Sequence, residues 1–380
     1  MGTEDKKKLM THSRAAIVVL LLTLISISSL LVWMFFFPDQ LLIEQLRTRS
    51  RSIIDGNGKI ILIRGLNYLE VTNIIQRLPN TSELEQIKGW GFNLIRLPIY
   101  WENLEPIESE VNQTFIERYI DPVVGWCQDN EMYILLDMHQ WHTSSHFIYE
   151  PEKESRGIGF PPWLCEGYDS EDPFLYDWWK NSVKNYPGGW DTFAGLWCTL
   201  AGRYRNDSYL AGYDIFNEPN RPSGMSEEEF NSKLLPAFYE YVMKTVMKVD
   251  AHHIFFFEGQ DGDTKPSLEK PGIDAKLIYT QHAYTTNYSL EGCRELLTRA
   301  TSKTQKWEIP LWIGEFGASQ NAESFAYNMT RALDEKIEAG ECSGWCWWCY
   351  LPENSENSTS VIDSSYEPKP VLEVLLDSIK

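Results

Sequence analysis

The stretch "GYDIFNEPN" (residues 212–220) is apolar in its middle and stops abruptly at polar residues that include the carboxylate Glu218. A second stretch, "LWIGEFGA" (residues 311–318), is built in the same way and carries Glu315. Continuous apolar runs of this length are typical of strands that are buried on both faces and therefore pair in parallel. Both stretches predict a buried strand that delivers a carboxylate at its carboxyl end.

Eight apolar runs in the chain end in polar side chains. The other six are KIILIRGLNY (59–68), FNLIRLPI (92–99), MYILLDMHQ (132–140), HHIFFFEG (252–259), LIYTQHAYT (277–285) and GWCWWCY (344–350). Segments long enough for helices, such as residues 81–91 and 227–250, lie between the runs. This alternation predicts an α/β fold of the (β/α)8 barrel type. An open α/β sheet is the alternative, but no Gly-x-Gly-x-x-Gly motif follows the first run.

The composition is that of a folded, acidic protein. Of the 380 residues 43% are apolar, which is enough for a sizeable core. Acidic residues outnumber basic ones by 54 to 34, so the net charge of −20 repels phosphates and no nucleic-acid partner is predicted. The 15 Trp and 19 Tyr suit the flat faces of sugar rings, and they also suit an ordinary core.

The amino-terminal residues predict a membrane anchor. A basic tail (residues 1–14) precedes an uncharged stretch (residues 15–37) that is long enough to cross the hydrocarbon core as a helix. This stretch lacks the small-x-small cleavage site of a signal peptide, although a cleaved signal is the alternative. We therefore predict a cytoplasmic tail, a transmembrane signal anchor, a short stalk (38–52) and a barrel domain (53–380).

The glycosylation motifs favour a barrel domain outside the cytoplasm. The motif Asn-x-Ser/Thr occurs at Asn80, Asn112, Asn206, Asn287, Asn328 and Asn357. We expect a single-pass membrane glycoprotein whose only membrane contact is the anchor. The oligomeric state is not predicted.

The seven cysteines are Cys127, Cys165, Cys198, Cys293, Cys342, Cys346 and Cys349, an odd number that leaves at least one thiol unpaired within the chain. The last three form a C-x3-C-x2-C cluster without a partner at zinc spacing. Buried thiols or a disulfide are therefore expected, and no metal site is predicted.

Polar residues at the ends of distant strands meet at one mouth of a barrel. Glu218 and Glu315 would face each other there, and two carboxyl groups across a cleft are the minimum required to cleave a glycosidic bond. One must be protonated to donate to the leaving oxygen, and the other must be ionised to attack. The run ends also supply Arg96, His139, Asn217, His282, Tyr284 and Trp348. An arginine near a carboxylate favours its charged form, and a tryptophan offers a flat face for a pyranose.

Residues 53–375 resemble glycoside hydrolase family 5, the cellulase-type enzymes within the clan of retaining β-glycosidases. The matching motifs are NLIRLP, LDMHQ, FNEP, QHAY, IGEFG and GWCWWCY, which together supply a counterpart for all eight hallmark residues in the expected order. The resemblance implies a (β/α)8 fold, retention of anomeric configuration through a covalent glycosyl-enzyme, and no metal or other cofactor.

The resemblance also implies roles for the residues that match. Glu218 would be the general acid and later the general base, and Glu315 the nucleophile. Arg96 and Tyr284 would hold the nucleophile in its charged form. The remaining roles are sugar binding by Asn217 at the 2-hydroxyl, by His139 and His282, and by Trp348 as the floor of the subsite. Two assignments have alternatives, namely Trp347 or Trp345 as the platform and Glu258 as a second-choice carboxylate.

The sequence leaves the substrate open. The long segment after the third run (residues 140–179) carries several tryptophans, and we expect it to shape specificity. We favour β-linked glucan-type poly- or oligosaccharides, with glycolipids cleaved as by endoglycoceramidases as the alternative. A noncatalytic sugar-binding barrel is the main competitor from another class. A Schiff-base aldolase lacks a lysine at a run end, and a metal-dependent hydrolase would need His139, His142 and His146 as ligands.

Overall fold

The computed structural model of the chain describes residues 45–68, 78–140, 143–148, 159–260, 268–351 and 359–380. These residues form one compact unit that begins at Gln45, eight residues before the predicted boundary at residue 53. None of the helices that the structure describes is long and apolar enough to cross a membrane. The predicted anchor (residues 15–37) lies outside the described residues.

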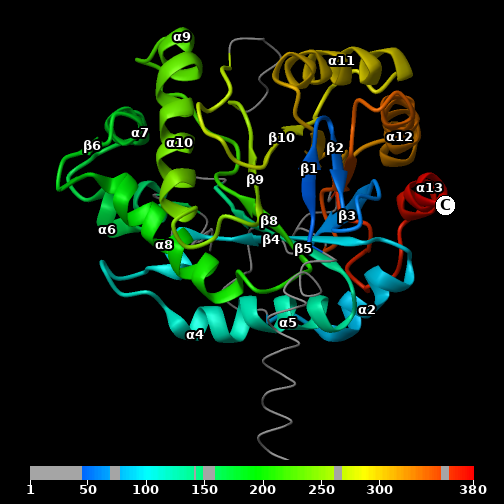
Figure 1. Cartoon of the computed structure of the whole chain (residues 1–380), viewed down its shortest axis with the longest axis horizontal. Helices are drawn as coiled ribbons and strands as arrows, with labels where there is room; N and C mark the ends of the chain where they lie inside the picture. Colours follow the sequence, from blue (N-terminus) through cyan, green and yellow to red (C-terminus); the bar gives the residue numbers. More distant parts are fainter. Residues whose placement is uncertain (1–44, 69–77, 141–142, 149–158, 261–267, 352–358) are drawn as a thin grey trace, which may run out of the picture. The chain divides into compact units, whose positions relative to one another are not determined.

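Eight parallel strands close into a barrel in the order β10-β11-β12-β3-β4-β5-β8-β9. Figure 1 shows this part of the chain from one side. Their bounds are β3 Ile63–Asn67, β4 Leu94–Ile99, β5 Tyr133–Met138, β8 Leu210–Asp214, β9 Ile254–Phe257, β10 Leu277–His282, β11 Leu311–Glu315 and β12 Gly344–Trp347. Each strand falls within or directly beside one of the eight predicted runs. The predicted (β/α)8 barrel is thereby confirmed.

Helices surround the strands (Figure 1). The longer ones are α2 Thr81–Gly89, α5 Asp121–Asp129, α7 Glu171–Trp179, α8 Gly189–Tyr204, α10 Leu235–Val246, α11 Leu290–Trp307, α12 Ala322–Glu338 and α13 Pro370–Ile379. Short turns are α3 Trp101–Leu104, α4 Gln113–Phe115, η2 Ile116–Ile120, η3 Ser145–Phe147, α6 Pro162–Cys165, α9 Glu227–Glu229 and η4 Phe230–Leu234. Two small hairpins, β1 Arg47–Arg49 with β2 Ser52–Ile54 and β6 Ser182–Val183 with β7 Tyr186–Pro187, complete the described structure.

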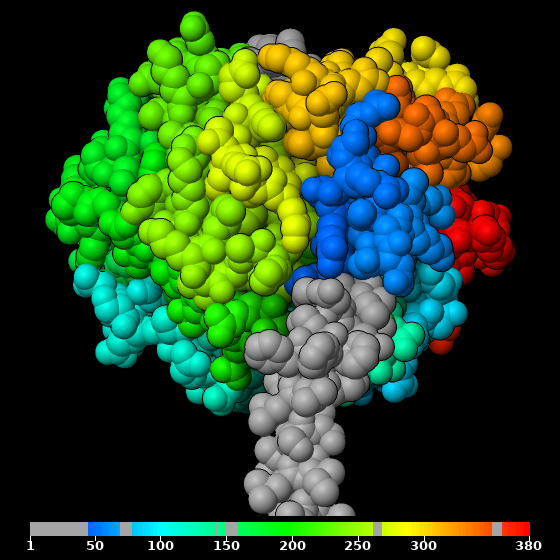
Figure 2. Space-filling view, in the orientation of Figure 1, coloured from blue at the N-terminus to red at the C-terminus, as the bar shows by residue number. Residues whose placement is uncertain are grey.

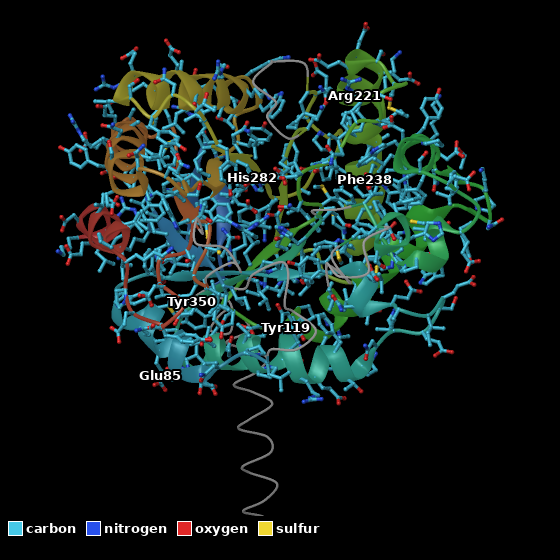
Figure 3. All side chains as sticks on the ribbon, turned by 180° about the vertical axis from the view of Figure 1, so that it is seen from behind. Glu85, Tyr119, Arg221, Phe238, His282 and Tyr350 are labelled. Atoms are coloured by element: carbon cyan, nitrogen blue, oxygen red, sulfur yellow. The ribbon has the colours of Figure 1, made fainter. Side chains whose placement is uncertain are left out.

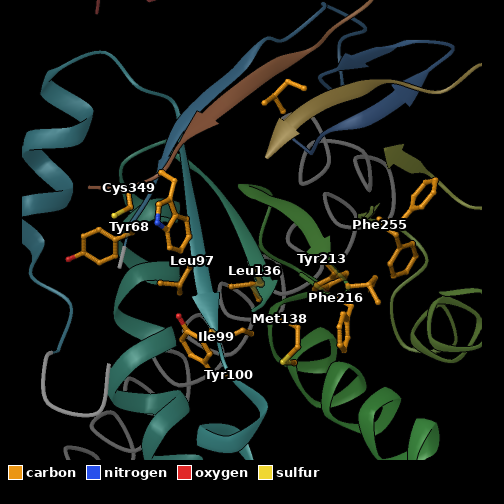
Figure 4. Packing of buried hydrophobic residues seen from close by; sticks show 14 of the residues in the cluster. Tyr68, Leu97, Ile99, Tyr100, Leu136, Met138, Tyr213, Phe216, Phe255 and Cys349 are labelled. Atoms are coloured by element: carbon orange, nitrogen blue, oxygen red, sulfur yellow. The ribbon is translucent and has the colours of Figure 1, made fainter. Parts of the chain in front are cut away.

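The apolar core has two layers. The outer layer lies between the barrel and its helices, where residues such as Leu97, Leu136 and Phe216 pack together (Figure 4). The inner layer fills the barrel with side chains from alternate strand positions and from the β1–β2 hairpin, namely Leu46, Ile53, Ile63, Leu94, Leu135, Ala211, Ile254, Phe256, Ile278, Trp312 and Cys346. The hairpin, blue in Figure 2, reaches the surface on the face shown. The barrel is therefore a packed scaffold rather than a pore.

The described tryptophans of the long segment after β5 belong to the core. Trp178 and Trp179 are fully buried and Trp163 is 9% exposed. Trp178 contacts the rings of Trp101 and Phe193, at centroid distances of 5.6 and 6.0 Å. These rings are not available to stack on a sugar, so the expected influence of this segment on specificity does not come from them. Trp141 and His142 lie outside the described residues.

Closure of the barrel between β12 and β3 requires a glycine at position 344. Gly344 has φ +131°, and a Cβ atom there would lie 2.0 Å from the main-chain oxygen of Ile63. Gly344→Ala should therefore lower the free energy of unfolding by about 2–6 kcal/mol, through strain and overpacking together. Gly125→Ala is the control, because Gly125 is an exposed residue of α5 with nothing within 4 Å of the added methyl group. This control should raise stability by roughly 0.5–1 kcal/mol. Equal thermal unfolding midpoints for the two variants would contradict the prediction.

Candidate active site

Seven of the eight predicted site residues lie at the carboxyl ends of barrel strands, and the eighth, Arg96, lies in the middle of β4. Arg96 belongs to β4, His282 closes β10 and Glu315 closes β11, whereas His139, Asn217, Glu218, Tyr284 and Trp348 follow the ends of β5, β8, β10 and β12. Figure 3 shows His282 among the strands, in contrast to Glu85 of α2 at the periphery. Residues separated by up to 252 positions, from Arg96 to Trp348, thus meet at one mouth of the barrel.

The two glutamates face each other across His282. The Nδ1 atom of His282 lies 2.6 Å from Oε1 of Glu218 and 3.5 Å from Oε2 of Glu315. One ligand atom from each of these three residues lies within 4.8 Å of the other two. Glu218 is 8% exposed and Glu315 is 4% exposed. The arrangement places two nearly buried carboxyl groups side by side.

Arg96 is fully buried at the centre of the site. Its Nη1 donates to Oε1 of Glu315 at 2.6 Å, and its Nη2 contacts carboxylate oxygens of Asp214 at 2.9 Å and Asp137 at 3.1 Å. Burial alone would lower the pKa of Arg96, but these carboxylates raise it well above its usual value. Arg96 therefore stays charged and fixes the orientation of one oxygen of Glu315.

Tyr284 holds the second oxygen of Glu315. Its hydroxyl donates to Oε2 at 3.1 Å, opposite the oxygen that Arg96 binds. Burial raises the pKa of Glu315 above its usual value of 4.5, while His282 and Arg96 oppose that rise. A carboxylate that accepts hydrogen bonds on both oxygens is stabilised in its ionised form. The two donors thus counteract the burial that would otherwise keep Glu315 protonated.

Burial favours the neutral form of both histidines of the site. Burial lowers the pKa of His139 to about 3, and it also lowers the pKa of His282. The Nδ1 atom of His139 lies 2.7 Å from Asp137, and its ring stacks on Trp348 with 5.2 Å between centroids and 12° between planes. Neutral imidazoles act here as hydrogen-bonding partners, and His139 fixes the plane of the indole.

Of the three neighbouring tryptophans, only Trp348 contacts other predicted site residues. Trp345 and Trp347 turn toward the helices and pack edge-on against Phe316, at centroid distances of 5.5 and 5.0 Å. Asn217 lies between the site and the adjacent strand, since its Oδ1 accepts from Arg96 at 2.9 Å and its Nδ2 donates to the carbonyl of Gln140 at 3.0 Å. An amide nitrogen carries two hydrogens, so the second can reach a ligand.

Three polar residues of the site are not among the eight site residues predicted from the sequence. Asp137 and Asp214 sit within apolar strands and bind Arg96, and Asn67 accepts from Nη1 of Arg96 at 2.8 Å. The sequence did give a signal for the two aspartates, since each is a charged residue inside an otherwise apolar run. A buried carboxylate requires a partner, so such a residue indicates a buried ion pair or hydrogen bond. Glu258, noted as a second-choice carboxylate, accepts from the main-chain N–H of Glu218.

Among the described residues one group, Glu218, His282 and Glu315, has the spacing to hold a metal ion. Within it, His282 and Glu218 already contact each other at 2.6 Å, so an ion would have to replace that contact. His139 and His146 do not converge as ligands, because their ring nitrogens contact Asp137 and the carbonyl of Tyr168. All seven cysteines are thiols, and all but Cys198 are buried.

Comparison with known proteins identifies relatives among glycoside-cleaving enzymes. A β-xylosidase of Phanerodontia chrysosporium is 24% identical over 66% of this chain and 49% of its own length. An endoglycoceramidase of Cyanea nozakii is 24% identical over 70% of this chain and 62% of its own length. The chain therefore spans about half to three fifths of these relatives.

The fold is shared with endo-glycoceramidase II from Rhodococcus sp., solved as a lactosyl-enzyme intermediate. That structure superimposes with a TM-score of 0.71 at 20% identity, over 86% of this chain and 80% of the other. The family model for cellulases, glycosyl hydrolase family 5, matches residues 54–353. With its eight-stranded barrel and the ordered residues at the barrel mouth, this chain belongs to glycosyl hydrolase family 5.

Proposed function

We propose that the protein is a retaining β-glycosidase that hydrolyses O-glycosidic bonds by double displacement. The observation that carries this proposal is the spacing of the two carboxyl groups, since one oxygen of Glu218 and one of Glu315 lie within 4.8 Å of each other. Retaining enzymes hold their carboxyl groups about 5–5.5 Å apart, whereas inverting enzymes leave about 6.5–9.5 Å for a water molecule. The closeness of these two oxygens favours the retaining arrangement.

In the first step Glu315 attacks the anomeric carbon as the bond to the leaving oxygen breaks. Glu218 gives its proton to that oxygen, so the aglycone leaves as an alcohol and a glycosyl ester of Glu315 remains. In the second step Glu218 takes a proton from water, the water oxygen attacks the anomeric carbon, and Glu315 departs as a carboxylate. Arg96 and Tyr284 stabilise the ionised nucleophile, because each donates to a different oxygen of Glu315.

The neighbouring residues supply sugar contacts. The second amide hydrogen of Asn217 is suited to the sugar 2-hydroxyl, a contact that strengthens as the anomeric carbon gains positive charge. Trp348, held flat by its stack on His139, provides the platform for the sugar ring. His139 and His282 are neutral and can therefore donate to or accept from hydroxyl groups.

The two glutamates should respond differently to substitution. Glu218→Ala should slow substrates with poor leaving groups by about 10²- to 10⁴-fold, because protonation of the leaving oxygen is lost. Activated aryl β-glycosides should suffer less, and azide should restore their turnover as a β-glycosyl azide. Glu315→Gln should abolish turnover of both substrate types without unfolding the protein. Substantial turnover by Glu315→Gln, or equal losses on both substrate types for Glu218→Ala, would contradict the assigned roles.

For the substrate we propose β-linked glucan-type poly- or oligosaccharides, in keeping with the cellulase family to which the chain belongs. A second candidate is a glycolipid cleaved between glycan and lipid. It is favoured by the endoglycoceramidase among the relatives and by the amino-terminal anchor predicted from the sequence, which would hold the barrel near lipid. Both candidates present a β-glycosidic bond to the same two carboxyl groups, and they differ only in the leaving group.

A substrate panel separates the candidates. β-1,4-Glucan oligosaccharides, mannan oligosaccharides and glucosylceramide in detergent should be compared, with product anomers followed by proton NMR. We expect cleavage of the glucan oligosaccharides with the β-anomer formed first. Cleavage of the ceramide substrate alone would favour the glycolipid candidate. The α-anomer as first product would contradict double displacement, and no cleavage of any substrate would contradict the proposed activity.

We propose further that the barrel domain is extracytoplasmic and glycosylated. The asparagines of three Asn-x-Ser/Thr motifs, Asn80, Asn206 and Asn287, are exposed. The amide nitrogens of Asn112 and Asn328 donate to main-chain carbonyls at 3.2 and 2.9 Å, and both residues are half-buried. The first three are therefore the better acceptors.

Expression in secretory cells tests this topology. We expect glycans at Asn80, Asn206 and Asn287, detected by peptide mass spectrometry before and after amidase treatment, and lower occupancy at Asn112 and Asn328. Deletion of residues 1–40 should release the barrel from the membrane fraction. Unmodified asparagines throughout, or a truncated chain that stays in the membrane fraction, would contradict the topology.

A further inference from the structure

A third glutamate, Glu258, lies directly behind the proposed acid/base. Glu258 follows the last residue of β9 and is 3% exposed. Its Oε1 accepts a hydrogen bond from the main-chain N–H of Glu218 at 2.6 Å, and its Oε2 lies 3.6 Å from Nε2 of His282. The main chain of Glu258 is itself fixed, because the hydroxyl of Tyr239 donates to its carbonyl at 3.1 Å. This carboxyl group is a rigid support rather than a flexible surface side chain.

The main chain at Glu218 needs such a support. Glu218 has φ +45°, in the left-handed region that non-glycine residues rarely adopt. Strained conformations of this kind persist only where surrounding contacts enforce them. The hydrogen bond from the Glu218 N–H to Glu258 fixes the peptide at this residue, and the direction of the Glu218 side chain depends on that peptide.

His282 connects the same two carboxyl groups through its ring. Nδ1 faces Glu218 at 2.6 Å, and Nε2 faces Glu258 at 3.6 Å. A neutral imidazole carries one hydrogen, on either nitrogen. When Glu218 is protonated it donates to Nδ1, so the ring hydrogen sits on Nε2 and faces Glu258. When Glu218 is ionised it accepts from Nδ1–H. The tautomer of His282 thus links the protonation of Glu218 to that of Glu258.

We propose that Glu258 is a positioning residue for Glu218, which fixes its peptide and, through His282, favours the protonated form that serves as the acid. The proposal rests on the proposed function for its catalytic meaning, but its geometric part stands on the contacts of Glu258 alone. Glu258 does not touch the reacting atoms, so it acts only through Glu218 and His282.

The groups that face Glu258 support this role. They come from β4, from β8 and the residues after it, and from β10 and α10, and they are Arg96, Asp214, Glu218, His282 and Tyr239. Burial, followed by repulsion from Asp214 and Glu218, raises the pKa of Glu258 well above its usual value, while the Glu218 N–H and Arg96 oppose the rise. Glu258 and Glu218 are therefore coupled, and a negative charge on one disfavours ionisation of the other.

Glu258→Gln separates charge from hydrogen bonding. The glutamine oxygen still accepts from the Glu218 N–H, but the side chain no longer ionises, and its NH2 group faces His282. Since this NH2 group donates to Nε2 of His282, the ring hydrogen is held on Nδ1, where it stabilises the ionised form of Glu218, so Glu218 should lose its proton at lower pH. The basic limb of the kcat/KM profile should then shift downward by about 0.5–1 pH unit. Glu258→Met also removes the acceptor and should reduce kcat on poor leaving groups by about 10- to 100-fold.

Glu105→Gln is the matched control. Glu105 is 2% exposed and likewise accepts from a main-chain N–H, that of Ser109 at 2.8 Å, but it lies outside the site. This variant should keep the wild-type basic limb. A merely structural role for Glu258 predicts that Glu258→Gln also keeps it, and that Glu258→Met slows activated and poor substrates equally. Either result would overturn the proposal.

The nitrogen NMR shifts of His282 give a readout that needs no turnover. Wild-type protein should show a population with the ring hydrogen on Nε2 between pH 5 and pH 8, about the range in which perturbed carboxyl groups titrate. Glu258→Gln should hold the hydrogen on Nδ1, because its NH2 group donates to Nε2. Identical His282 shifts in the two proteins would overturn the link between Glu258 and His282. If the shifts differ while the wild-type protein cleaves no glycoside, the proposed function fails and the linkage stands.

Discussion

The buried guanidinium of Arg96 is the constraint on which the site depends. A charge inside a protein is costly unless it is paired and hydrogen bonded, and Arg96 meets this requirement only where three carboxylates converge. Those carboxylates come from β5, β8 and β11, and the ion pairs therefore link these three strands to β4, which carries Arg96. A shift of any of these strands by one residue would turn its carboxylate to the other face of the sheet. The same contacts that stabilise the mouth of the barrel therefore set the position of Glu315.

Strand register carries the geometry from Arg96 to the other half of the site. β10 and β11 pair in parallel, and their register shifts between Gln281 and His282, so that His282 is paired with Glu315. Irregularities of this kind re-aim side chains at the rims of barrels. Here the shift accompanies an imidazole that lies between the two glutamates. The packed interior below the rim keeps the strands rigid, and the irregular pairing at the rim determines where the polar side chains point.

The sequence was sufficient to predict the barrel and the eight residues at its mouth, because each apolar run ended in a polar group and strand ends must converge. It could not predict how those groups pair. Asp137 and Asp214 lie inside runs where a single charged residue gives no indication of its partner. The long aromatic segment was ambiguous for a related reason, since the tryptophans of a loop and those of a core have the same composition. Only packing distinguishes Trp178, which is fully buried, from a sugar platform.

The helical spacing of apolar residues also predicted only part of the buried face of α10. Residues 227–250 are long enough for a helix and carry apolar residues at helical spacing, among them Leu234, Phe238 and Tyr241. The π-helical turn η4, which ends at Leu234, inserts a wider turn before α10 and rotates the face that follows. Phe238, Val242 and Val246 are buried as the spacing indicates, but Leu234 and Tyr241 are only partly covered. Leu235, Tyr239 and Met243 are buried in addition. The register of this helix matters to the site, because Tyr239 supports the main chain of Glu258.

The charge balance of the mouth accounts for the coexistence of an acid and a nucleophile. Five carboxyl groups (Asp137, Asp214, Glu218, Glu258 and Glu315) lie at the mouth with Arg96, the single arginine that the described structure places among them, and burial favours the neutral form of the histidines beside them. Burial raises the pKa of both aspartates to about 6, against the opposing charge of Arg96, and raises that of Glu258 further above its usual value. One guanidinium cannot compensate five negative charges in a buried space, so some of these groups must retain protons near neutral pH.

Glu315 accepts hydrogen bonds from the arginine and from a tyrosine hydroxyl, which favours its ionised form. Glu218 lies on the far side of His282, next to another carboxyl group and away from the arginine, and this position favours a retained proton. The difference between the proposed acid and the proposed nucleophile thus follows from where one buried cation sits.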